Sequence, residues 1–168
     1  VVDHGNGIYT NDTDVDSAIG VDAWASAMPD ELVLTMSAGN ASYGYSAAPT
    51  PIATAVDADG NLKLGGRVLI VGNYNKTTGG IDGGQAGHVC RDFSNGTCND
   101  AYVTSDFYIL APGIAVNSTY KDGAYKEMSG TSMASPVVAG AVAIVHQLWP
   151  YMKGENIAQL LLQTADKD

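Results

Sequence analysis

The chain has 168 residues, 45% of them hydrophobic, which is enough to bury the core of one globular domain. Its net charge is −10, from 18 acidic and 8 basic residues; this argues against a nucleic acid as partner, because phosphate binding needs clustered Lys and Arg. No uncharged apolar run reaches the roughly 18 residues that would predict a membrane segment. The start lacks a positively charged head followed by an apolar stretch, so no signal peptide is predicted.

The first elements expected along the chain are a strand, a helix and a second strand. The opening VVDHG (residues 1–5) has the pattern of a strand. Residues 12–28 predict a surface helix, because apolar residues recur every four positions and aspartates crowd the end where the helix dipole favours negative charge. Pro29 ends this helix. The following run LVLTMSAGN (32–40) is continuously apolar until Gly-Asn, as is typical of a buried strand in a parallel sheet.

Two more buried strands and two helices follow. The strands are RVLIVGN (67–73) and DFYILAPG (106–113), and the stretch 74–104 between them is rich in Gly, Asn and Thr and longer than most loops. Residues 132–148 predict a helix that is apolar almost all round and therefore buried, and residues 155–163 predict an amphipathic helix. Strands that alternate with helices indicate a layered α/β fold.

Two cysteines, Cys90 and Cys98, lie in the polar loop HVCRDFSNGTC. A zinc site would need four ligands and only His88 is near, so no zinc site is predicted. We expect a short disulfide formed in an oxidising compartment, with two free thiols as the alternative. The scattered acids leave calcium open as a cofactor, but no loop has the ligand spacing of an EF-hand and no metal ligand is assigned.

The stretch MSGTSMASPVVAG (128–140) gives Ser132 an unusual setting. Proline is tolerated in the first turn of a helix, so Pro136 predicts that the buried helix begins within a few residues of Ser132. The hydroxyl would then lie at the positive end of the helix dipole, where an oxyanion is stabilised, and Gly130 would allow a substrate to approach closely. A nucleophile fits this spacing, and so does a simple helix cap formed by Thr131 or Ser132.

The string GTSMASP, followed by VVAGAVAIV, resembles the serine motif of the subtilisin-like serine proteases, the subtilases. SAGN (37–40) resembles the oxyanion motif of that family, LAPG (110–113) the turn before its serine loop, and LLLQTAD the helix that ends its catalytic domain. The resemblance implies an α/β fold of three layers, with a mostly parallel sheet between helices, incomplete on its N-terminal side. Residues 1–168 are expected to be the C-terminal portion of one catalytic domain, with insertions at about 48–66 and 74–104.

Carried over by position, the resemblance makes Ser132 the nucleophile and Asn40 the side-chain donor of the oxyanion hole, which the backbone N–H of Ser132 completes. Asn after Gly at a strand end also fits a turn, but the carboxyl end of a parallel strand is where open α/β sheets place their sites. The opening VVDHG resembles the edge strand along which subtilases bind an extended substrate. The residues expected to contact substrate on these segments are Gly5, Ser37, Ala38, Gly39, Gly130 and Thr131.

The histidine and aspartate motifs that precede the serine in subtilases are not present in the sequence. His146 follows Ser132 by 14 residues on the same predicted helix. It is therefore about 21 Å away along the axis and cannot act as the base. Too few residues follow His4 before the oxyanion motif for it to belong to the missing motifs, and His88 is interpreted as a loop residue. We therefore expect the base and its carboxylate upstream of this sequence, which makes the chain a fragment that is inactive alone.

The predicted function is that of a secreted or cell-surface serine endopeptidase, which cleaves peptide or protein substrates through an acyl-enzyme on Ser132. Its expected partner is the upstream part of its own catalytic domain. An α/β-hydrolase is excluded, because its acid and histidine follow the serine in that order, whereas here His146 precedes Asp166. A pseudoprotease or binding module on the same scaffold is the alternative, and the presence of both Ser132 and Asn40 argues against it.

Overall fold

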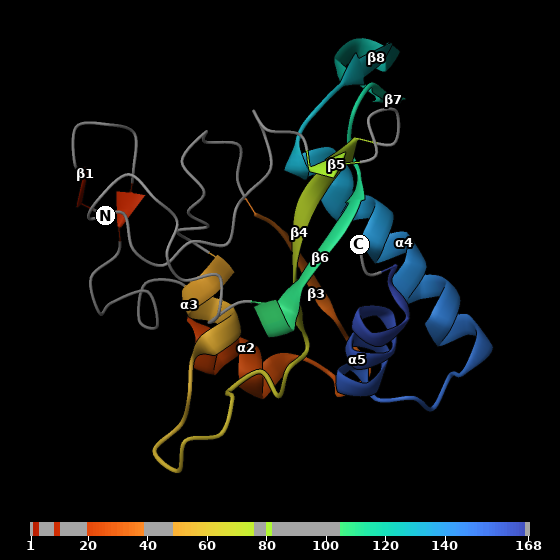
Figure 1. Cartoon of the computed structure of the whole chain (residues 1–168). Coiled ribbons are helices and arrows are strands. Elements are labelled where there is room, and N and C mark those ends of the chain that lie inside the picture. The colour runs from red at the N-terminus through yellow and green to blue at the C-terminus, as the bar shows by residue number, and fades with distance from the viewer. Residues whose placement is uncertain are drawn as a thin grey trace.

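The computed structural model describes residues 2–3, 9–10, 20–38, 49–75, 80–81 and 105–166 (Figure 1). In chain order, the strands are β1 (Val2–Asp3), β2 (Tyr9–Thr10), β3 (Leu34–Ser37), β4 (Val68–Asn75), β5 (Gly80–Ile81), β6 (Tyr108–Pro112), β7 (Val116–Thr119) and β8 (Tyr125–Met128). The α-helices are α2 (Val21–Ala27), α3 (Pro49–Thr54), α4 (Thr131–Leu148) and α5 (Gly154–Thr164). Short 3₁₀ helices cover Ser105–Phe107 and Lys121–Gly123.

The central sheet is built around β4, which pairs in parallel with β3 on one side and with β6 on the other. Ser37 pairs with Val71 at the end of β3, and Gly72 pairs with Leu110 on β6. Among the described strands of this sheet, only β5 runs antiparallel, beside the last residues of β4. Residues 68–73 of β4 are all buried, which explains why this strand is a nearly continuous apolar run.

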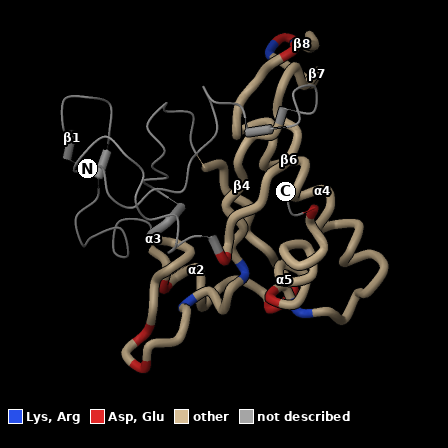
Figure 2. The backbone as a smooth tube through the Cα atoms, in the orientation of Figure 1, with Lys and Arg blue, Asp and Glu red and all other residues tan. Residues whose placement is uncertain are grey.

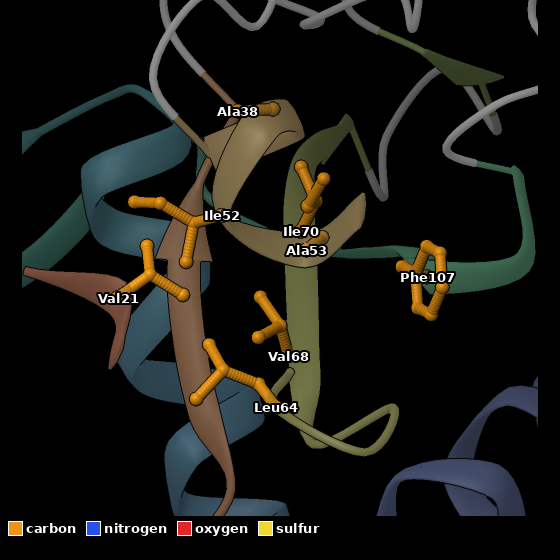
Figure 3. Packing of buried hydrophobic residues seen from close by; sticks show 8 residues of the cluster. All are labelled: Val21, Ala38, Ile52, Ala53, Leu64, Val68, Ile70 and Phe107. Atoms are coloured by element: carbon orange, nitrogen blue, oxygen red, sulfur yellow. The ribbon is translucent and has the colours of Figure 1, made fainter. Parts of the chain in front are cut away.

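Helices cover both faces of this sheet (Figure 1). Successive side chains of β4 point to opposite faces, so each face of the strand packs against a different pair of helices. Val68 and Ile70 face α2 and α3, where they join an apolar cluster (Figure 3). That cluster is completed by Val21, Ala38, Ile52, Ala53, Leu64 and Phe107. Leu69 and Val71 face α4 and α5, where they pack with Ala111, Ala134, Val138 and Ala158. The α/β fold with a mostly parallel sheet between helices is therefore confirmed.

The structure agrees with most of the predicted elements. The strands predicted over 32–40, 67–73 and 106–113 are β3, β4 and β6, and the two C-terminal helices are α4 and α5. The helix predicted over 12–28 is described only from residue 20, where Gly20 has φ 66° and α2 begins. Of the long excursion at 74–104, only the end of β4 and the two residues of β5 lie in the described part.

Two further segments contribute helix or strand to the fold. The segment at about 48–66 contains α3 and supplies Ile52, Ala53 and Leu64 to the core, and its status as an insertion stays a prediction. The hairpin of β7 and β8 was not predicted. Its turn contains Asp122 and Gly123, both with positive φ (59° and 73°), and an Asp-Gly pair between two strands is a recognised hairpin signal.

The prediction that α4 is buried is wrong for the described residues. One side of α4 packs on β3, β4 and β6, but Val137, Ile144 and Leu148 on its surface are 44%, 61% and 63% exposed. No Lys, Arg, Asp or Glu interrupts the helix (Figure 2). By length and composition alone its 18 residues, with a mean hydropathy of 1.3, are long and apolar enough to cross a membrane. The side that packs on β3, β4 and β6 makes α4 part of the layered fold.

The tightest contact between β4 and β6 is at Gly72. The Tyr108 side chain of β6 lies over this glycine, and a Cβ at position 72 would be 2.7 Å from both its ring carbon Cζ and Leu110 Cδ2. Burial raises the pKa of the Tyr108 phenol to about 12. A glycine inside a strand is typical of such a close approach, so residue 72 has no room for a side chain.

We predict that Gly72→Ala lowers the melting temperature of this chain, because overpacking a filled core costs roughly 1–3 kcal/mol. Thermal unfolding followed by circular dichroism measures the change. The matched control is Gly140→Ala on α4, where no atom lies within 4 Å of a Cβ. The control should be stabilised by about 1 kcal/mol, the usual gain for alanine in a helix interior. An unchanged melting temperature for Gly72→Ala would contradict the packing described here.

Candidate active site

Ser132 is the second residue of α4 and its side chain is exposed. The helix begins beside the carboxyl ends of the parallel strands, since Gly130, its N-cap residue, is hydrogen-bonded to Gly113 directly after β6. The first turn of α4 contains no acidic side chain, and its N-cap residue, Gly130, has no side chain that could cap the helix. The positive end of the helix dipole therefore lies beside the Ser132 hydroxyl.

Backbone contacts fix the loop that precedes Ser132. The Gly130 N–H donates to the Gly113 carbonyl oxygen at 2.8 Å, and the Ala115 N–H donates to Ser129 Oγ at 3.0 Å. One turn into α4, Ser135 Oγ donates to Thr35 Oγ1 on β3 at 3.3 Å. The serine loop is thus joined to β6 through its backbone and to β3 through the first turns of the helix.

The position of Pro136 differs from the prediction. It is the sixth residue of α4, in the second turn and not the first. Because proline has no N–H, the carbonyl oxygen of Ser132 lacks the hydrogen bond that residue 136 would otherwise donate. The helix nevertheless begins one residue before Ser132, within the few residues expected.

The predicted substrate-contact residues have different environments. Gly130 and Thr131 are buried, and Ser37 is half-buried at the end of β3. Ala38 is 1% exposed in the cluster on the α2–α3 face, and its N–H donates to the Val71 carbonyl oxygen at 2.9 Å. The Ala38 side chain therefore packs in the core at the strand end, and its predicted contact with substrate stays a prediction.

Several predicted functional residues lie outside the described part of the chain. These are Gly5, Gly39, Asn40, Cys90 and Cys98, so their predicted roles stay predictions. Among the histidines, His4 and His88 are also outside it, whereas His146 is described and half-buried in the last turn of α4. Its place on the helix of Ser132 confirms the separation that excludes it as the base.

Asn73 is a residue near the site that the sequence reasoning did not select. It is fully buried near the end of β4, and neither its Oδ1 nor its Nδ2 has a hydrogen-bond partner among the described residues. In the sequence, Asn73 is the polar residue that ends the apolar run RVLIVGN, which alone indicates the end of a strand. The burial of its carboxamide depends on α4, which is distant in the sequence.

Other features of the described residues do not form a competing site. Within ranges 20–38, 49–75 and 105–166, no group of three or more His, Cys, Asp or Glu side chains could hold a metal ion. An open hollow of about 760 Å³ lies at the opposite edge of the sheet from Ser132, lined by residues that include Gly66, Asp106 and Glu155. This hollow is therefore not part of the site around Ser132, which lies at the carboxyl edge of the sheet.

Comparison with known proteins decides the family. A sequence model described as the subtilase family matches residues 5–168, which is nearly the whole chain. The chain belongs to the subtilase family. The position of Ser132 in this subtilase, at the start of α4 and the carboxyl edge of the sheet, is consistent with the serine motif recognised in its sequence.

Individual relatives agree with this assignment. Subtilisin Savinase from Lederbergia lenta is 31% identical over 135 residues, which cover 77% of this chain and 49% of that protein. Subtilisin DY from Bacillus licheniformis is 40% identical over 63 residues, covering 38% of this chain and 23% of that protein. The chain thus spans half or less of these relatives.

Solved structures share the fold at lower sequence identity. The self-cleaved protease domain of PatA has a TM-score of 0.60 and 21% identity, covering 92% of this chain and 60% of its own. The prenylagaramide maturation protease PagA has a TM-score of 0.57 and 24% identity, covering 99% of this chain and 49% of its own. These likenesses support the subtilisin-like fold.

We predict that Gly113→Ala disorders the serine loop. A Cβ at position 113 would be 2.5 Å from Asn73 Oδ1 and 2.6 Å from the Gly130 carbonyl oxygen, so the loop has to move away from β6. Amide hydrogen exchange measures this, and the protection of the Gly130 N–H should fall by at least about tenfold. Gly60→Ala is the control: Gly60 has φ 83°, so the substitution strains a remote loop without touching the serine loop and should leave that protection unchanged. Equal protection in both variants would contradict the predicted displacement.

Proposed function

We propose that the protein containing this chain is a serine endopeptidase and that Ser132 forms the acyl-enzyme. The observation that carries the proposal is the exposed Ser132 hydroxyl in the first turn of α4, in a chain of the subtilase family. A hydroxyl in this position can approach an extended peptide, while the N–H groups of the helix start face the oxygen of the attacked carbonyl. The substrate class is peptide or protein.

The reaction follows from these groups. Ser132 Oγ attacks the scissile carbonyl carbon while a base removes its proton, and the carbonyl oxygen becomes an oxyanion. The Ser132 N–H and the Asn40 side chain stabilise that oxyanion. Collapse of the tetrahedral intermediate breaks the C–N bond, the amine leaves with a proton from the base, and water then hydrolyses the ester on Ser132.

We infer that the base and its orienting carboxylate come from the upstream part of the same catalytic domain. His146 is too far from Ser132, and the chain spans about half of Subtilisin Savinase. In this account the present chain supplies the nucleophile and the oxyanion hole, and the upstream part supplies the groups that move the proton. The chain alone is therefore expected to be inactive.

The uncovered side of α4 supports this division of the domain. Val137, Ile144 and Leu148 are exposed on a helix that has no charged side chain apart from its terminal histidine (Figure 2). Apolar area of this kind marks a surface that another polypeptide covers. We assign it to the upstream part, which then lies beside the helix of the nucleophile.

The place of action is proposed to be outside the cell. The sequence motif that supports this is the pair Cys90 and Cys98, for which a disulfide is the expected state in an oxidising compartment. No metal or other cofactor is needed for the acyl-transfer steps described above. Calcium remains a candidate stabilising ion without assigned ligands.

We predict that Ser132→Ala abolishes both peptide hydrolysis and covalent labelling by a fluorophosphonate, because the attacking oxygen is lost. The variant is made in the protein that includes its upstream region, and mass spectrometry of tryptic peptides locates the label. Ser118→Ala, which removes an exposed serine on β7, is the control and should keep both activities. If the unmodified protein is not labelled at Ser132, the endopeptidase proposal is wrong and a non-catalytic binding role is favoured.

We also predict that Asn40→Ala lowers kcat by about 10²–10³-fold, with a smaller change in KM. This figure is the loss measured for the oxyanion asparagine of a subtilisin, so it is a family value. The physical reason is that the asparagine donates to the oxyanion, which exists only near the transition state. Steady-state kinetics on a peptide anilide measures it. Loss of less than about threefold would show that Asn40 is a turn residue and not an oxyanion donor.

A further inference from the structure

Asn73 breaks the apolar row that faces α4. On β4 the side chains of Leu69 and Val71 pack against that helix, and Asn73 is the next residue on the same face of the strand. Its relative exposure is 0%, yet within the described part of the chain its carboxamide oxygen and nitrogen both lack a hydrogen-bond partner. A carboxamide buried without partners is unfavourable, so an apolar side chain of the same shape would be more stable here.

The carboxamide lies against the backbone that orients Ser132. The position of a Cβ on Gly113 would be 2.5 Å from Asn73 Oδ1, 2.6 Å from the Gly130 carbonyl oxygen and 3.1 Å from Ala134 Cβ. Asn73 is therefore packed where the turn after β6 meets the serine loop. Gly130, the residue that caps α4 two positions before the nucleophile, lies against the same glycine.

Gly113 brings Asn73 and Gly130 to one place, because Asn73 Oδ1 and the Gly130 carbonyl oxygen both lie against its backbone, 2.5 Å and 2.6 Å from where its Cβ would be. Both of these oxygens are hydrogen-bond acceptors. A half-turn of the carboxamide exchanges Oδ1 and Nδ2 and puts an N–H donor on the Gly113 side in place of the acceptor. The Gly130 carbonyl already accepts the Met133 N–H at 3.0 Å and the Ala134 N–H at 3.3 Å, which are the hydrogen bonds that begin α4.

We propose that Asn73 is a positioning residue for Ser132: its amide donates to the Gly130 carbonyl oxygen in the reacting enzyme and holds the first turn of α4 in place. This proposal rests on the proposed function of Ser132. The Gly130 carbonyl marks the helix start, so fixing it also fixes the Ser132 N–H that faces the oxyanion. Asn73 touches neither substrate nor reacting atoms and acts through the backbone of Gly130.

The test compares variants of the protein that includes its upstream region. Asn73→Leu keeps the volume but removes both polar atoms, and Asn73→Asp keeps the shape but removes the N–H donor. In both, kcat for a peptide anilide and the rate of fluorophosphonate labelling should fall about tenfold, the effect of one neutral hydrogen bond, with KM changed by less than about twofold. The melting temperature of Asn73→Leu should stay close to that of the unmodified protein, because burial of an apolar side chain of the same volume offsets the lost hydrogen bond.

Val71→Ala is the matched control, two residues earlier on the same strand and also fully buried. It should lower the melting temperature, because it leaves a cavity under α4, while kcat at a temperature well below unfolding is retained. A merely structural role for Asn73 predicts the opposite pattern, in which Asn73→Leu lowers the melting temperature and kcat is unaffected.

The outcomes separate this proposal from the function on which it rests. If the unmodified protein is labelled at Ser132 and Asn73→Leu is labelled at the same rate, Asn73 does not position the serine and the endopeptidase function stands. If the unmodified protein is not labelled, the function fails and the role of Asn73 fails with it. Slow labelling of both Asn73 variants, with stability retained in Asn73→Leu, supports the positioning role.

Discussion

The hydrogen bond from the Gly130 N–H to the Gly113 carbonyl oxygen determines where α4 begins. It joins the end of β6 to the last residue before the helix, in a space so narrow that Gly113 cannot carry a side chain. Because β6 pairs with the central strand β4, the start of α4 is attached through β6 to the most buried strand of the sheet. This junction fixes the position of the Ser132 backbone, although the side chain of Ser132 is exposed.

The arrangement places a nucleophile at an edge where two parts of a domain are proposed to meet. One side of α4 packs on the sheet of this chain, and large apolar residues are exposed on its other side. The physical demand on such a helix is that it be apolar on both sides, which explains why its sequence has almost no polar face. An upstream segment that covers α4 would bring its proton-transferring groups to the end of the helix where Ser132 lies.

Much of the fold could be predicted from the sequence, because its signals are local. The apolar runs that became β3, β4 and β6 are closed by Gly, Asn or Pro, and the serine motif located the start of α4 within one residue. What failed depends on contacts between distant residues. Pro136 was expected in the first turn and α4 was expected to be buried, because the depth of a proline in a helix and the sides on which the helix packs depend on residues distant in the sequence.

The candidate site could be predicted less completely than the fold. A motif identifies Ser132, but the burial of Asn73 and the narrow contact at Gly113 arise only when β4, β6 and α4 come together. The β7–β8 hairpin shows the reverse case: its Asp-Gly turn was a local signal that was available and was not used. Residues whose role depends on packing are therefore found only once the strands have been placed in order.

The central claim is that the start of α4 binds the oxyanion formed when Ser132 is acylated. The most direct test is a crystal structure of the protein with its upstream region after reaction with a fluorophosphonate. The account predicts phosphorus bonded to Ser132 Oγ, with one phosphonyl oxygen within about 3.2 Å of the Ser132 backbone nitrogen and of the Asn40 amide. A phosphonyl oxygen turned away from the helix start, or a label on another residue, would contradict it.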